Sequence, residues 1–130
     1  MIEGGCLCKS IRYAAEGPFF DAANCHCTEC RASSGAPFLS FFSVARDRFR
    51  FTKGKPREYR SSPVDVRSFC PDCGTQLTFW TSRAADTIDV TMGSLDDPGA
   101  VVAEADIWLR SKVPWVVRDE RLPAHEKART

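Results

Sequence analysis

Seven cysteines in three short clusters constrain this chain of 130 residues more than any other feature of its sequence. The densest cluster contains Cys25, Cys27 and Cys30, at positions i, i+2 and i+5. The other two clusters are the pairs Cys6 with Cys8 and Cys70 with Cys73. Thiols at such spacings are typical of metal coordination. Three ligands in one cluster and two plus two in the others predict two metal ions of different kinds.

The two outer pairs together supply four thiolates, the closed tetrahedral set of a structural Zn²⁺. Residues 70–74, Cys-Pro-Asp-Cys-Gly, predict a knuckle in which two thiolates converge on one ion around a tight turn. We expect an extended backbone through Cys6 and Cys8, with both thiols on one side and Leu7 directed into the core. A disulfide framework, a thioredoxin-like motif and an iron–sulfur cluster fit less well. The odd number of cysteines argues against a disulfide framework. No βαβ setting is evident for a thioredoxin-like motif, and the cysteine spacing is not that of ferredoxins.

Cys25, Cys27 and Cys30 supply only three ligands, which leaves the fourth position of a tetrahedral zinc open to water or substrate. Such a vacancy predicts a catalytic site. The alternative is a site closed by a fourth protein ligand, for example His26, and zinc storage or sensing is a further possibility. We expect His26 instead to make a hydrogen bond behind the ligands or to lie at the surface.

Many short segments alternate apolar and polar residues, and Gly or Pro turns separate them, which predicts a mainly β domain. The expected strands cover residues 9–14, 19–23, 36–44, 49–52, 58–60, 64–69, 76–80, 87–92, 105–109 and 114–117. Residues 53–56 predict a hairpin-like connection, and Gly35 predicts the end of a short helical turn. We expect one zinc-stapled domain over residues 1–130.

Composition excludes little beyond membrane proteins. The formal net charge of +1 argues neither for nucleic acid nor for a membrane as partner. No window approaches the roughly 20 apolar residues of a membrane span, and the first residues lack the pattern of a secretory signal. We therefore expect a cytoplasmic protein, where cysteines seldom form structural disulfides.

Residues 46–67 contain more basic than acidic side chains and include several aromatic residues. The basic residues are Arg46, Arg48, Arg50, Lys53, Lys55, Arg57, Arg60 and Arg67. The segment could bind nucleic acid or an anionic ligand, or form the solvated face of alternating strands. A non-catalytic zinc module that binds protein or nucleic acid through this segment is the alternative to an enzyme.

The whole cysteine pattern resembles the glutathione-dependent formaldehyde-activating enzyme family, which includes centromere protein V. The resemblance rests on Gly-Gly-Cys-x-Cys, Cys-His-Cys-x-x-Cys-Arg and Phe-Cys-x-x-Cys-Gly, and extends to the later segments 93–98, 107–108 and 112–115. It implies a β-sheet fold shared with methionine sulfoxide reductase B and a Rab exchange-factor accessory protein. The chain departs from the pattern at Asp106, where many relatives carry histidine.

The resemblance also implies an activity, the condensation of formaldehyde with glutathione by a carbon–sulfur lyase. It assigns Cys6, Cys8, Cys70 and Cys73 to a structural zinc, and Cys25, Cys27 and Cys30 to a catalytic one. A small thiol and an aldehyde would be the substrates. The carboxylates of such a thiol need cationic donors, and Arg31 beside the cluster is our first candidate, ahead of Arg60 and Arg67.

Overall fold

The alternating segments fold into two sheets, which are seen in a computed structural model that describes residues 1–129. Thr130, the last residue of the expected domain, lies outside the described residues. The smaller sheet has the antiparallel order β1 (Ile2–Gly5), β2 (Arg12–Ala15), β5 (Phe49–Lys53). The prediction of a mainly β protein is confirmed.

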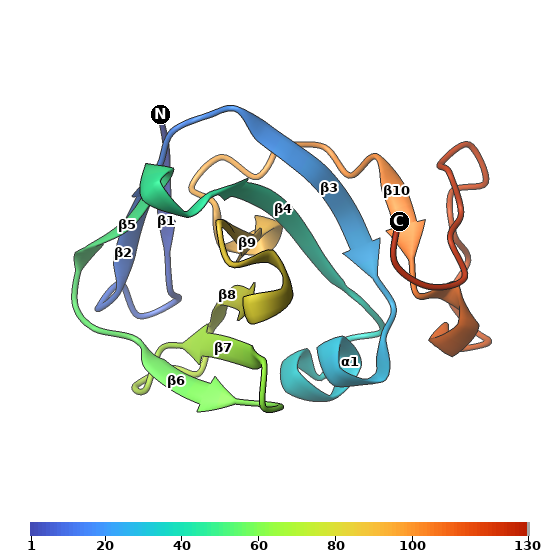
Figure 1. Cartoon of the computed structure of the whole chain (residues 1–130), viewed down its shortest axis with the longest axis horizontal. Coiled ribbons are helices and arrows are strands. Elements are labelled where there is room, and N and C mark those ends of the chain that lie inside the picture. The colour runs from blue at the N-terminus through green and yellow to red at the C-terminus, as the bar shows by residue number, and fades with distance from the viewer. Residues whose placement is uncertain (130) are drawn as a thin grey trace.

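The larger sheet has seven strands, and Figure 1 shows its longest members, β3 and β4, running side by side. Its order is β10 (Ala105–Ile107), β3 (Phe19–Cys25), β4 (Leu39–Ala45), β9 (Thr87–Thr91), β8 (Gln76–Thr81), β7 (Asp65–Phe69) and β6 (Arg57–Arg60). All neighbours are antiparallel except β10 and β3, which are parallel. The helix α1 (Thr28–Ser34) joins β3 to β4.

The two faces of the larger sheet have different surroundings. On β4, Phe42 and Val44 are fully buried in the main core, together with Tyr13 from β2. Because side chains alternate along a strand, Phe41 and Ser43 lie on the opposite face. There they line a cavity, which is the site described below.

Two local predictions are wrong. Residues 53–56 do not form a hairpin, because β5 belongs to the smaller sheet and β6 to the larger one. Residues 114–117 form a turn and irregular chain, with Val117 96% exposed. Apolar side chains without a neighbouring strand or a core to cover them do not become a strand.

The predicted similarity of the fold to that of methionine sulfoxide reductase B stays a prediction.

Among residues 1–129, no helix combines the length and the apolar character that crossing a bilayer requires.

Candidate metal centres and the cavity

The sulfur atoms of the four outer cysteines lie close together, although the two pairs are more than 60 positions apart in sequence. All four sulfur atoms lie within 4.8 Å of one another. The Sγ atom of Cys8 is 3.7 Å from that of Cys6 and 3.7 Å from that of Cys70. Tetrahedral zinc with bonds of about 2.3 Å separates its sulfur ligands by about 3.8 Å. This donor set therefore fits a closed zinc site that could join the start of the chain to its middle.

Backbone turns, and not a strand, present these thiols. Cys6 and Cys8 lie in the connection between β1 and β2, where Lys9 has a positive φ of 67°. The expected extended backbone is therefore wrong, and Leu7 is 83% exposed instead of in the core. A chain reversal aims both thiols at one point just as well, and it leaves the intervening side chain in solvent.

The second pair lies on the predicted knuckle between β7 and β8. Gly74 closes it with a φ of 80°, which favours glycine, and donates its N–H to the carbonyl of Cys70 at 2.8 Å. The N–H groups of Asp72 and Cys73 each donate to Cys70 Sγ at 3.4 Å. Such donors stabilise a thiolate, as a zinc ligand requires.

The three inner cysteines form the second group, at the junction of β3 and α1. Cys25 ends β3, Cys27 is the residue before α1, and Cys30 lies in the first turn of the helix. Their sulfur atoms lie within 4.8 Å of one another, with 3.3 Å between those of Cys30 and Cys25. The N–H of Cys30 donates to Cys27 Sγ at 3.2 Å. The spacing i, i+2, i+5 converges because the chain changes from strand to helix within it.

The three thiols shift one another's pKa values. Hydrogen bonds from Cys25 and Cys30 lower the pKa of Cys27 to about 2, whereas hydrogen bonding to Cys27 raises the pKa of Cys25. Three thiolates this close repel one another unless a cation joins them. Among residues 1–129, no further His, Cys, Asp or Glu completes this group. The set therefore fits an ion with one position left open.

His26 lies between two of these cysteines but turns away from them. Its side chain is 1% exposed, and its Nε2 is 3.1 Å from Asp106 Oδ1. The expectation of a hydrogen bond behind the ligands holds, and the alternative of surface exposure does not. His26 is not part of the three-cysteine group.

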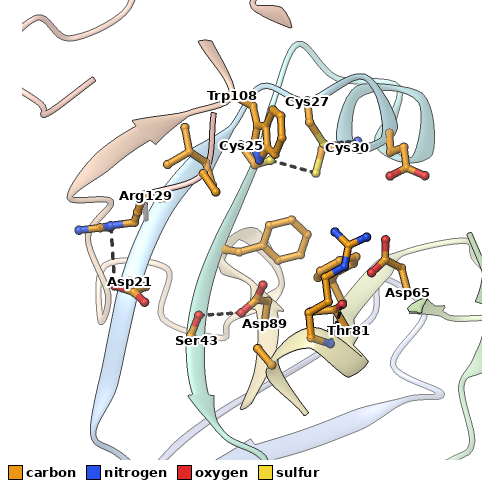
Figure 2. A pocket seen from close by; sticks show the side chains of 18 of the residues that line it. Asp21, Cys25, Cys27, Cys30, Ser43, Asp65, Thr81, Asp89, Trp108 and Arg129 are labelled. Atoms are coloured by element: carbon orange, nitrogen blue, oxygen red, sulfur yellow. Dashed lines mark hydrogen bonds and ion pairs between the residues drawn. The ribbon is translucent and has the colours of Figure 1, made fainter. Parts of the chain in front are cut away.

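The three-cysteine group borders a cavity of about 890 Å³ on the outer face of the larger sheet. Figure 2 shows Cys25, Cys27, Cys30 and Trp108 gathered at one end, with Ser43 and Asp89 at the other. Phe41, Phe79 and Ile107 add apolar walls. A pocket of this size, with apolar walls beside the cysteines and polar groups around them, is typical of a small-molecule site.

A cross-strand row forms part of the floor of this cavity. Ser43, Asp89, Phe79 and Arg67 are register partners on β4, β9, β8 and β7. Ser43 donates to Asp89 at 2.6 Å. Burial raises the pKa of Asp89 to about 6, although Ser43 and Arg67 act in the opposite direction. The row places a carboxyl group and a guanidinium in one cavity.

Arg67, which the sequence analysis ranked behind Arg31, is a cation that lies beside the three-cysteine group. It is 5% exposed, and its Nη2 lies 3.6 Å from Cys30 Sγ. Arg31 is half-buried on α1, with its Nε atom buried and without a hydrogen-bond partner, and it is not among the described residues that line the cavity. A role of Arg31 in binding a substrate carboxylate stays a prediction.

The other basic residues of segment 46–67 are all exposed. They include Arg60, our other weaker candidate, and Arg46, whose guanidinium lies 4.9 Å from the Trp80 ring centroid. This pattern fits a solvated face of alternating strands. Binding of nucleic acid through this face stays a prediction, which salt-dependent retention on nucleic acid would check.

Comparison with known proteins agrees with this geometry. Residues 1–111 match the family described as glutathione-dependent formaldehyde-activating enzyme. The chain belongs to this family. A solved structure of a Rhodobacter sphaeroides protein superposes with a TM-score of 0.64 at 20% identity, covering 74% of this chain and 89% of that one, and shows the same fold.

One curated relative of this family member comes from Schizosaccharomyces pombe and is named an uncharacterized lyase. It is 37% identical over 79 residues, which are 59% of this chain and 56% of the relative. The match therefore spans little more than half the length of that relative.

Proposed function

We propose that this family member is a zinc-dependent carbon–sulfur lyase that joins a small aldehyde, such as formaldehyde, to a thiol such as glutathione. The observation that carries the proposal is the three-cysteine group with an open position at the edge of a large cavity. Family membership and the relative named as a lyase support the same class of reaction.

Cys25, Cys27 and Cys30 would hold the catalytic zinc, and Cys6, Cys8, Cys70 and Cys73 the structural one. When bound, the catalytic zinc would lower the pKa of a substrate thiol and so supply a thiolate nucleophile at neutral pH. Trp108 and Phe41 would shield that sulfur from bulk water, since both line the cavity next to the cysteines. The cavity volume of about 890 Å³ leaves room for a thiol of tripeptide size beside a one-carbon aldehyde.

The test is turnover of formaldehyde and glutathione by the zinc-loaded protein and by a Cys27→Ser variant. We expect the variant to fall to the uncatalysed rate and to hold one zinc per chain instead of two. Ala32→Ser, an exposed change on the same helix, is the matched control and should keep both ions and the full rate. Equal rates for the wild-type protein and Cys27→Ser, both at the uncatalysed background, would remove the proposal.

A further inference from the structure

Arg67 is a buried cation without an acidic partner of its own. Its side chain is 5% exposed, and none of the ion pairs found among residues 1–129 includes it. Its Nε atom is buried and has no hydrogen-bond partner, and its guanidinium lies over the Phe79 ring, 4.9 Å from the centroid. Burying a charge lowers stability unless the charge is paired. Among residues 1–129, no carboxylate forms an ion pair with Arg67, and the polar side chain it contacts is Cys30.

The position of Arg67 relative to the cysteines identifies what could pair with it. Its Nη2 is 3.6 Å from Cys30 Sγ, so the guanidinium lies directly beside the three-cysteine group. A substrate sulfur on the same ion as Cys30 would lie about 3.8 Å from Cys30 Sγ, and therefore no more than about 7 Å from Arg67 Nη2. The carboxylates of a thiol such as glutathione lie several bonds from its sulfur. Arg67 is thus placed near the point where the sulfur of the substrate would react.

We propose that Arg67 is a catalytic residue that donates a hydrogen bond to the aldehyde oxygen while the carbon–sulfur bond forms. This inference rests on the proposed function. The electron pair of the thiolate forms the new bond to carbon, and the π pair of the carbonyl moves to oxygen. Cavity water gives that oxygen a proton, and the proton lost by the thiol neutralises the resulting hydroxide. Thiol and aldehyde thereby become a hydroxymethyl thioether, with no oxidation or reduction.

A fixed charged donor aimed at an oxygen that gains negative charge stabilises the transition state more than the ground state. Arginine suits this task because its guanidinium stays protonated and, in this site, lies over the ring of Phe79. A competing role is merely to neutralise the negative charge of the three thiolates. A second competing role is to bind a carboxylate of the thiol.

The experiment compares zinc-loaded wild-type protein with Arg67→Gln, Arg67→Lys and the control Arg57→Gln. Arg57 is an exposed arginine on β6, next to the strand of Arg67. Four quantities are measured: zinc per chain, kcat, the KM for each substrate, and the affinity for formate by calorimetry. Formate is the probe because it presents negatively charged oxygen on a single carbon. Circular dichroism confirms that each variant is folded, and Arg67→Lys serves alone if Arg67→Gln does not fold.

For Arg67→Gln we expect a drop in kcat of about 100-fold, with both zinc ions retained and the KM for glutathione within twofold. Arg67→Lys keeps the charge but loses the planar fork, so a drop of about tenfold is expected. Formate affinity should fall at least tenfold in Arg67→Gln. Arg57→Gln should match wild type in every measurement.

Three results would overturn the inference. Unchanged kcat and formate affinity in Arg67→Gln would leave Arg67 without a catalytic role. Loss of zinc from both Arg67 variants would assign it to the metal group. A higher KM for glutathione at unchanged kcat would assign it to the carboxylate of the thiol. Absence of turnover in wild type would instead remove the proposed function, and the formate measurement would still decide whether Arg67 binds such an oxygen.

Discussion

His26 and Asp106 lie 80 positions apart and share a hydrogen bond of 3.1 Å between two buried side chains. Asp106 also accepts from Asn24 Nδ2 at 3.1 Å and from Arg118 Nε at 2.8 Å. Burial alone would raise the pKa of Asp106, but the hydrogen bonds from Arg118, His26 and Asn24 hold it below its usual value. One carboxylate thereby joins β3, β10 and the C-terminal segment behind the three-cysteine group.

Replacing Asp106 by alanine should lower the free energy of unfolding by about 3 kcal/mol. The loss leaves His26 and Arg118 without their charged acceptor in a buried place. Chemical denaturation measures the change. Asp119→Ala is the control, because its partner Arg121 is 89% exposed, and the free energy of unfolding should change little there. An equally small loss for Asp106→Ala would show that solvent reaches the network.

The two cysteine groups should respond differently to loss of a ligand. Cys70→Ser should unfold the chain, because a structural zinc contributes on the order of 10 kcal/mol in small domains. Cys27→Ser should release one ion and keep the β-sheet spectrum. Metal analysis per chain and circular dichroism measure both effects. A folded Cys70→Ser protein with the wild-type melting temperature would contradict the structural role of the four-cysteine group.

Asp89 should make the protein less stable as the pH rises through about 6. Its pKa is raised to about 6, mainly by burial and also by Asp21, while Ser43 and Arg67 oppose the shift. The native state keeps this proton in a range where the unfolded chain has lost it, so its contribution to stability disappears as pH rises through the native pKa.

An Asp89→Asn variant has no such proton to lose. Its free energy of unfolding, relative to wild type, should therefore increase by about 1 kcal/mol between pH 5 and pH 7.5. Urea denaturation of both proteins at the two pH values measures this difference. A difference that does not depend on pH would mean that Asp89 ionises in the native state as it does in the unfolded chain.

Trp108 has a left-handed backbone, with φ 58° and ψ 38°, which costs a bulky residue about 1 kcal/mol or more. Glycine adopts this conformation freely, whereas alanine does not. We therefore expect Trp108→Gly to be more stable than Trp108→Ala by about 1 kcal/mol, the reverse of the usual order. Both variants lose the same indole, so the comparison isolates the backbone. Thermal or urea denaturation measures it, and the usual order would contradict a strained backbone.

The sequence by itself determined the two cysteine groups and most of the strands. Spacings such as those of Cys70 with Cys73, or of Cys25, Cys27 and Cys30, reflect how one turn or one strand-to-helix junction aims its thiols. This geometry is local. The alternation in segments such as 76–80 and 87–92 is local too, because it depends only on the side-chain period of a strand. The cysteine spacing and the alternation can therefore both be recognised from the sequence alone.

Only the tertiary structure decided which residues share the cavity. Arg67 is one of eight basic residues in segment 46–67, and its burial follows from its register opposite Phe79 and its contact with Cys30. The hydrogen bond between His26 and Asp106 depends on the parallel pairing of β10 with β3. Residues 114–117 have the apolar character of a strand but no neighbour to pair with. Burial and pairing are properties of contacts between distant segments, and no local spacing encodes them.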